Sequence, residues 1–390
     1  MDYRALVDAL RTRVVEIDPT AVAADPPDVL IDIREPEERA TGRIPGALEI
    51  PRGTLEMTIE TAVPDRSSRI VLYCSGGHRS ILAARTLGEL GYEHVASLAG
   101  GYDAWKAAGL PSDGGGGLSI DQRIRYDRHL RVPEIGEKGQ LLLLESSVLV
   151  VGAGGLGSPA AMYLAAAGVG RIGLVDDDTV DLSNLQRQIL HDTTTIGRRK
   201  VDSGGATLRR LNPDVEVVTH PVRLGADNVL DLLDGYDVVV DAADNFPTRY
   251  LLNDAALKAG VPVVHGSVYR LEGQVTVFDA TEGPCYRCLY PLPPPPELAP
   301  SCAEAGVIGS LPGVIGSIQA VEAVKLLVGI GDPLRGRLLL YDAAEQRFTE
   351  LSTRRDPHCR ACGIDRSDIV LVDYDPSCAP RRPGDDRLLR

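Results

Sequence analysis

Short apolar segments alternate with longer amphipathic segments along most of the chain. In the first part we predict buried strands over 29–33, 69–74 and 94–98, and helices over 79–90 and 101–108. Strands that alternate with helices in this way are typical of α/β proteins with a mostly parallel sheet.

The same alternation starts again after residue 145. Its predicted strands are rich in β-branched residues and cover 146–152, 171–176, 215–220, 236–244 and 261–266. Helical stretches separate them, which predicts a second and larger doubly wound domain. We expect two later strands, over 274–280 and 337–343, to pair antiparallel.

Glycine-rich and proline-rich segments divide the chain. Four consecutive glycines at 114–117 indicate a flexible linker, and six prolines within 291–300 indicate an extended, exposed loop. The residues after Asp365 show little periodicity. The predicted division is a first domain over 1–112, a linker over 113–118, a second domain over 119–366 and a tail over 367–390.

Composition excludes several classes of protein. The 390 residues are 44% hydrophobic, so a core can be buried, and the net charge of −14 is spread over both domains. We therefore expect neither nucleic acid nor an anionic membrane as a partner. The 25 uncharged residues from 146 to 170 include six glycines and Pro159, which indicates a strand, a glycine turn and a helix rather than a membrane span.

The N-terminus and the cysteines point to a cytoplasmic protein. Charges interrupt every apolar run near the N-terminus, so we expect no signal peptide. Four of the seven cysteines form two C-x-x-C pairs. In a reducing compartment this favours metal or thiol chemistry over structural disulfides.

The first chemical motif is Cys74-Ser75-Gly76-Gly77-His78-Arg79-Ser80, which lies between a predicted strand and a predicted helix. Loop N–H groups and the positive end of the helix favour the Cys74 thiolate and would hold a terminal anionic sulfur. Arg79 can neutralise a bound anion. A lone cysteine at a strand end is usually buried and inert, but the glycines and the arginine favour the reactive interpretation.

Together with the segments 32–38, 42–47 and 98–105, this loop resembles a rhodanese domain over about residues 1–111. The resemblance implies a sulfurtransferase that carries persulfide sulfur on Cys74. Cysteine phosphatases have a related loop with five residues between the cysteine and the arginine. Only four are present here, so we expect phosphate to fit poorly.

The second chemical motif, Gly152-Ala153-Gly154-Gly155-Leu156-Gly157, follows a predicted strand and opens a helix. Backbone N–H groups in such a loop bind phosphate, and Gly152, Gly154 and Gly155 are candidate nucleotide-binding residues. Asp176, at the end of the next strand, can accept hydrogen bonds from ribose hydroxyls. These features alone also fit an NAD(P)-dependent oxidoreductase.

A polar run that is not typical of dehydrogenases follows at 176–188 and 197–200. Its candidate polyphosphate contacts are Asn184, Gln186, Arg187 and Lys200. Cations there would stabilise charge on a departing pyrophosphate. Asp244 and Asn245, at another strand end, could position Mg²⁺. A solvated charged face explains any one of these residues, but explains the whole set less well.

These motifs, with Arg125–Arg128 and the segments 272–278 and 312–317, resemble the MoeB/ThiF type of adenylyltransferase over about residues 119–363. The family activates ubiquitin-like sulfur carriers. The resemblance implies that Asp176 holds ribose, that Arg187 and Lys200 hold the phosphates of ATP, and that Asp244 serves Mg²⁺. It also implies a homodimer in which Arg128 reaches into the neighbouring protomer's site.

Five of the six remaining cysteines suggest a metal site and a carrier link, whereas Cys378 belongs to no motif. Cys285/Cys288 and Cys359/Cys362 suit tetrahedral Zn²⁺, and the resemblance strengthens that interpretation over a redox-active pair. Cys302 matches a cysteine that forms a covalent link to the carrier on a mobile loop of the family. A small apolar residue beneath a loop is the alternative for Cys302.

The resulting hypothesis is a sulfur-relay enzyme. It adenylates the C-terminal glycine of a ubiquitin-like carrier that ends in Gly-Gly. The Cys74 persulfide, loaded by an upstream donor, attacks the adenylate, and another thiol such as Cys302 then releases the carrier thiocarboxylate. The sequence does not distinguish between four pathways, which are molybdopterin synthesis, thiamine synthesis, tRNA thiolation and cysteine synthesis.

Two alternatives also remain, an NAD(P)-dependent oxidoreductase and a non-catalytic docking scaffold for a ubiquitin-like protein. In related fusions the sulfurtransferase domain follows the adenylyltransferase domain, whereas here it precedes it.

Overall fold

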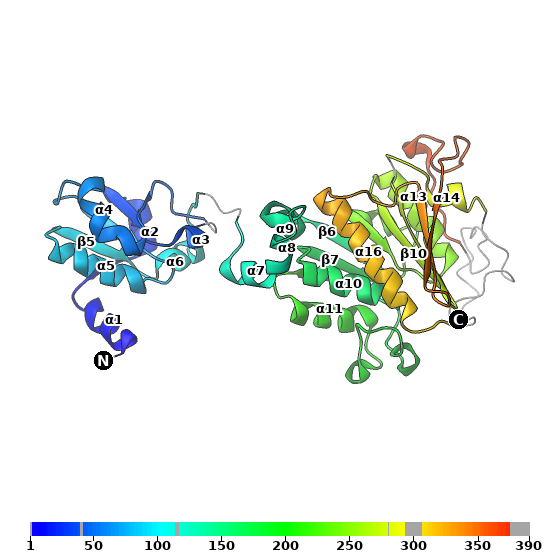
Figure 1. The fold of residues 1–390 in the computed structure, drawn as a ribbon, viewed down its shortest axis with the longest axis horizontal. Coiled ribbons are helices and arrows are strands. Elements are labelled where there is room, and N and C mark those ends of the chain that lie inside the picture. The colour runs from blue at the N-terminus through cyan, green and yellow to red at the C-terminus, as the bar shows by residue number, and fades with distance from the viewer. Residues whose placement is uncertain (1, 40–41, 114–116, 280, 293–305, 375–390) are drawn as a thin grey trace. The chain divides into compact units, whose positions relative to one another are not determined.

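The computed structural model describes residues 2–39, 42–113, 117–279, 281–292 and 306–374. The chain divides into two compact units, one over Met1–Asp127 and one over Arg128–Arg390 (Figure 1). Each unit is described by itself.

The first unit contains a five-stranded sheet in the order β1-β5-β4-β2-β3, with every neighbouring pair parallel. The strands are β1 Val15–Ile17, β2 Val29–Asp32, β3 Leu48–Glu49, β4 Arg69–Tyr73 and β5 His94–Leu98. The helices are α1 Tyr3–Arg11, α2 Pro19–Ala24, α3 Pro36–Arg39, α4 Leu55–Ala62, α5 His78–Glu89, α6 Gly101–Ala107 and α7 Ile120–Arg125. The predicted parallel sheet is confirmed. The sequence pattern missed β1 and β3 because two or three residues are too few to show a period.

Helices cover both faces of this sheet. Along β4, Ile70 and Leu72 lie in a buried cluster with residues of α4 and α5. Val71 and Tyr73 lie in a second cluster with residues of α2 and α6. Because successive side chains of a strand point to opposite faces, the one apolar run of β4 supplies both cores.

The second unit contains an eight-stranded sheet in the order β13-β12-β11-β10-β9-β6-β7-β8. The strands are β6 Ser147–Val151, β7 Arg171–Val175, β8 Glu216–His220, β9 Val238–Asp241, β10 Val263–Tyr269, β11 Glu272–Phe278, β12 Arg337–Asp342 and β13 Arg347–Ser352. The pairs from β8 to β10 are parallel, and those from β10 to β13 are antiparallel. The predicted antiparallel pairing of the two late strands is therefore confirmed.

Helices also cover both faces of the parallel part of this sheet. The helices are α8 Asp127–Leu130, α9 Gly136–Glu145, α10 Gly157–Ala167, α11 Lys200–Leu211, α12 Val229–Leu233, α13 Phe246–Ala259, α14 Tyr286–Leu289 and α16 Leu311–Val328. Residues of α10, α11 and α16 share one buried cluster with the sheet, and residues of α12 and α13 share the other. In Figure 1, α16 runs across the sheet beside α10.

Among the described residues, α16 is the one helix long and apolar enough to cross a membrane. Its Leu311, Ile315, Ala320 and Ala323 belong to the buried cluster of the second unit. This packing identifies α16 as a core helix of the second unit.

The predicted strand over 236–244 ends at Asp241, three residues early. The Asp241 carboxylate accepts a hydrogen bond from the Ala243 N–H at 3.1 Å, so the chain turns out of the sheet there.

Part of the predicted tail packs on the second unit. Leu371 and Tyr374 lie against the buried cluster of α12 and α13.

A fully buried ion pair between Arg34 and Asp32 stabilises the first unit. The Arg34 guanidinium donates to both Asp32 carboxylate oxygens, with the shortest N–O distance 2.6 Å, and it donates to the carbonyl oxygen of Gly42 at 2.7 Å. The central carbon of the Arg34 guanidinium lies 4.2 Å from the centre of the Tyr102 ring. These contacts join the end of β2 to the loop before β3 and to α6.

We expect Asp32→Ala to destabilise the first unit by about 3–5 kcal/mol, because it leaves the Arg34 charge buried without its partner. The single tryptophan of the chain, Trp105, is buried in α6, so its fluorescence reports unfolding of the first unit alone. The guanidinium chloride midpoint of this signal should fall. Asp8→Ala, at a well-exposed position of α1, is the matched control. An equal midpoint in both variants would contradict the assigned role of the pair.

Candidate functional site

Cys74 directly follows β4 and is 1% exposed. Its sulfur lies 3.7 Å from the Ser80 hydroxyl in the first turn of α5. Ser80 donates to the Gly77 carbonyl at 3.0 Å and accepts from Ser97 of β5 at 2.8 Å. The sulfur therefore lies against a buried pair of hydroxyls at the start of a helix, where the helix dipole favours negative charge.

The second half of the motif fixes the shape of the loop. The N–H groups of Tyr102 and Asp103, at the start of α6, donate to the carbonyls of Cys74 and Ser75 at 2.8 and 3.0 Å. A Cβ on Gly101 would lie 2.3 Å from the Cys74 carbonyl oxygen. Glycine is therefore required at 101, and the segment 98–105 contributes to the same site as the cysteine.

Arg79 forms an ion pair with a residue that the sequence interpretation did not include. Its guanidinium forms two hydrogen bonds to the Glu38 carboxylate, at 2.8 and 2.5 Å. The Ser75 hydroxyl donates to Glu38 at 2.9 Å. Hydrogen bonding to Arg79 lowers the pKa of Glu38 to about 2, so this carboxylate is ionised at neutral pH. Glu38 lies in the 32–38 segment that carries the family resemblance, and this position was the signal that could have identified it.

The second unit contains a cleft of about 340 Å³ where β6 and β9 end side by side. The strand order reverses there, which is the usual ligand site of a doubly wound sheet. Predicted residues that line the cleft are Gly152, Gly154, Gly155, Asp176, Arg187, Lys200, Asp244 and Asn245. Gln188, Arg223, Thr248 and Arg249 line it as well, although the sequence interpretation did not single them out as site residues.

The glycine loop is held by groups on both sides. Gly152 has φ +100°, and its N–H donates to the Val175 carbonyl at 2.8 Å. The Ala153 N–H donates to the Asp176 carboxylate at 2.8 Å, and burial raises the pKa of Asp176. A ring nitrogen of His191 lies 2.9 Å from the Ala153 carbonyl oxygen. Asp176 therefore orients the loop and occupies one of its N–H groups.

The two predicted cations that line the cleft, Lys200 and Arg187, come from different segments. Lys200, the first residue of α11, is buried, and its ammonium lies 2.7 Å from the Asp178 carboxylate. Arg187 donates to the Ser183 carbonyl at 3.2 Å. Both cations line the cleft with the glycine loop, so they are placed to meet an anionic ligand there.

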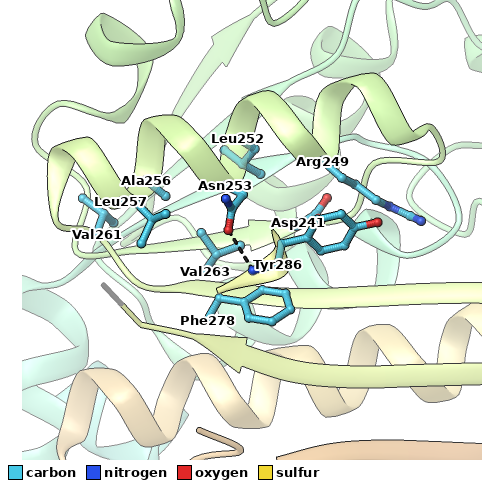
Figure 2. A pocket seen from close by; sticks show the side chains of 10 residues that line it. All are labelled: Asp241, Arg249, Leu252, Asn253, Ala256, Leu257, Val261, Val263, Phe278 and Tyr286. Carbon is cyan, nitrogen blue, oxygen red and sulfur yellow. Dashed lines mark hydrogen bonds between the residues drawn. The ribbon is translucent and has the colours of Figure 1, made fainter. Parts of the chain in front are cut away.

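Asp244 is exposed in the cleft, and its neighbour Asn245 caps α13 by accepting from the Thr248 N–H at 2.9 Å. The Arg249 guanidinium stabilises the turn before α13, because it donates a hydrogen bond to the Ala243 carbonyl at 2.9 Å. Figure 2 shows Arg249 and Asp241 at one end of a small pocket between α13 and the sheet. Apart from Asp241, Arg249 and Asn253, the lining is apolar or aromatic, and most of it belongs to the buried cluster of α12 and α13.

The structure does not bring every predicted residue into the cleft. Asn184 accepts from the Asp181 N–H at 3.1 Å as part of a capping box, and neither Asn184 nor Gln186 lines the cleft. Arg128 is exposed and does not line the cleft of its own chain. Cys302 lies outside the described residues.

The two C-x-x-C pairs meet although 70 residues separate them. Their sulfurs are 3.8 Å apart for Cys285–Cys288, 3.6 Å for Cys285–Cys359 and 3.4 Å for Cys288–Cys362. Four sulfurs at 2.3 Å from a tetrahedral zinc would lie about 3.8 Å apart. The cluster is therefore compatible with Zn²⁺.

Comparisons with known proteins cover both units. A model described as the ThiF family matches residues 126–361, and a model described as a rhodanese-like domain matches residues 20–108. A sulfur carrier protein adenylyltransferase of Thermus thermophilus is 53% identical over 66% of this chain and 97% of that protein. A SAMP-activating enzyme E1 of Haloferax volcanii is 51% identical over 67% of this chain and 98% of that protein.

A longer relative is the adenylyltransferase and sulfurtransferase MOCS3 of Mus musculus. It is 50% identical over 70% of this chain, and the match spans 60% of the mouse protein. Among solved structures, E. coli MccB superimposes with a TM-score of 0.56 at 20% identity, over 62% of this chain and 72% of that chain. At this identity the structural likeness establishes the fold alone.

We expect Gly157→Ala to abolish nucleotide binding at the cleft, because the new Cβ would lie 1.8 Å from the Gly152 carbonyl oxygen and would displace the glycine loop. Gly313→Ala is the control, since no heavy atom lies within 4 Å of a Cβ there. Titration calorimetry with ATP measures the effect, and circular dichroism checks the fold. Unchanged ATP affinity in Gly157→Ala would show that the loop does not form the binding site.

Proposed function

Because the chain belongs to the ThiF family and carries a rhodanese-like domain before the matched region, we propose that it couples adenylation of a sulfur carrier to sulfur transfer. The substrate is the C-terminal glycine of a ubiquitin-like carrier protein, and the product is its thiocarboxylate. The observation that carries this proposal is the cleft, which combines a glycine loop, the cations Arg187 and Lys200 among others, and the exposed carboxylate of Asp244 where the parallel strands end.

The cleft residues suit attack of a carboxylate on the α-phosphorus of ATP. The carrier carboxylate forms a bond to that phosphorus, and the bond to pyrophosphate breaks. Arg187 and Lys200 stabilise the charge that develops on the departing pyrophosphate. Asp244 would hold Mg²⁺, which neutralises phosphate charge when bound. The products are a carrier acyl-adenylate and pyrophosphate.

The rhodanese-like domain supplies the sulfur. The terminal sulfur of a Cys74 persulfide attacks the activated carbonyl, and AMP leaves with its bonding electrons. This leaves an acyl group linked to Cys74 through two sulfurs. A thiolate then attacks the Cys74 sulfur, which releases the carrier thiocarboxylate and forms a disulfide with Cys74. Cys302 is our candidate for that thiol, and a cellular dithiol would reduce the resulting disulfide.

The alternative functions explain fewer of these features. An oxidoreductase needs the glycine loop and Asp176, but it has no use for a persulfide-carrying domain. A docking scaffold would not need Lys200 and Arg187 in the cleft. The names and identities of the relatives also support adenylation and sulfur transfer over both alternatives.

Several finer features extend the proposal. Cys285, Cys288, Cys359 and Cys362 would hold a structural Zn²⁺. We propose a homodimer in which Arg128 completes the cleft of the neighbouring protomer. Arg128 is exposed and does not line the cleft of its own chain, which supports this arrangement. The persulfide donor is a separate protein or small molecule, and the reaction takes place in the cytoplasm, where thiols stay reduced.

We expect Arg187→Ala to lower carrier-dependent ATP–pyrophosphate exchange by at least about a hundredfold, because a cation facing the leaving group is removed. Arg198→Ala is the matched control, since Arg198 is exposed on the same segment and does not line the cleft. Exchange is measured with labelled pyrophosphate. Equal loss in both variants, or loss in neither, would argue against the assignment.

Cys74→Ala separates the two reactions. We expect this variant to retain ATP–pyrophosphate exchange and to lose formation of carrier thiocarboxylate, because only the sulfur-transfer step uses the thiol. Mass spectrometry of a Gly-Gly carrier incubated with ATP and a persulfide source follows both the adenylate and the exchange of oxygen for sulfur. An unchanged thiocarboxylate yield would remove Cys74 from the relay.

A further inference from the structure

Arg79, the cation of the Cys74 loop, already has a carboxylate partner. Glu38 accepts two hydrogen bonds from the Arg79 guanidinium, at 2.8 and 2.5 Å, and a third from the Ser75 hydroxyl at 2.9 Å. The Glu38 side chain is 16% exposed, compared with 35% for Arg79. The pair is therefore partly shielded from water, where charges interact more strongly than at an open surface.

The pair changes the charge that a sulfur donor meets. Ser75 and Arg79 are partly exposed beside Cys74, so a donor that comes from solvent passes them. Arg79 alone would attract an anion in proportion to the anion's charge. Glu38 cancels that attraction, and the loss is greatest for a donor with two negative charges.

We propose that Glu38 is a specificity-determining residue that disfavours small doubly charged sulfur donors and leaves Cys74 to donors of low charge, such as persulfides. The inference rests on the sulfurtransferase step proposed above. Glu38 acts through Arg79, and the property it sets is the order of preference among donors.

The loading step is the same for each class of donor. The Cys74 thiolate attacks the sulfane sulfur, a new S–S bond forms to Cys74, and the donor's own S–S bond breaks. With thiosulfate the leaving group is sulfite, and with a persulfide it is a thiolate. Each leaving group takes the bonding electron pair, so no external oxidant or reductant is needed.

Thiosulfate and methanethiosulfonate provide a matched test, because both deliver a sulfane sulfur but carry two charges and one charge. In Glu38→Gln the amide can keep the hydrogen bond to Arg79 while the negative charge is lost. We expect the single-turnover loading constant for thiosulfate to rise by about tenfold, and that for methanethiosulfonate by about threefold. Mass spectrometry of the full chain counts the sulfur added to Cys74.

Two further variants separate charge from structure. Glu37→Gln removes a charge at an exposed neighbouring position and should leave the ratio of the two loading constants unchanged. Glu38→Asp keeps the charge and should also preserve the ratio, even if both constants fall. Trp105 fluorescence checks that each variant remains folded.

The ratio of the two constants decides the inference. A ratio in Glu38→Gln within twofold of the ratio in the unmodified chain would overturn it, as would a parallel fall for both donors. Should Glu38→Gln fail to fold, a changed ratio in Glu38→Asp would overturn it, whereas a preserved ratio would support it. Absence of sulfur on Cys74 in the unmodified chain with both of these donors and with a persulfide would instead contradict the sulfurtransferase step itself.

Discussion

Both sites depend on close backbone approach at the carboxyl end of a buried parallel strand. After β6, Gly157 allows the first turn of α10 to lie against the Gly152 carbonyl, and after β4, Gly101 allows α6 to lie against the Cys74 carbonyl. Any side chain at either position would displace the loop, since its Cβ would lie 1.8 or 2.3 Å from an oxygen. These contacts fix the glycine loop of the cleft and the loop that carries Cys74.

One cation of each site shares a second property, which is a carboxylate partner. Lys200 pairs with Asp178 in the cleft, and Arg79 pairs with Glu38 beside Cys74. A partly buried cation without a partner is costly, so each carboxylate stabilises its cation in the folded chain. Asp178 is largely exposed, whereas Glu38 is mostly buried, so phosphate can replace the first partner more readily than a sulfur donor can replace the second.

The sequence predicted the fold well where apolar runs were long, as in β4, β6 and β7. It also predicted most cleft residues, because the glycine loop and the strand ends are local signals. It missed the partners of those residues. Glu38 lies 41 positions from Arg79, and Asp178 was one member of an acidic run, so neither pairing follows from local pattern. Asn184 was expected at the phosphates, but its side chain completes a capping box, a role that the same residue type performs equally well.

The cysteine cluster is connected to the cleft through α13. The Tyr286 N–H, next to Cys285, donates to Asn253 of α13 at 2.8 Å, as Figure 2 shows. Arg287 pairs with Asp254 on the same helix at 2.6 Å. The first turn of α13 is the one capped by Asn245 in the cleft. A metal that held the four sulfurs together would therefore also restrain α13, the helix that begins at the cleft.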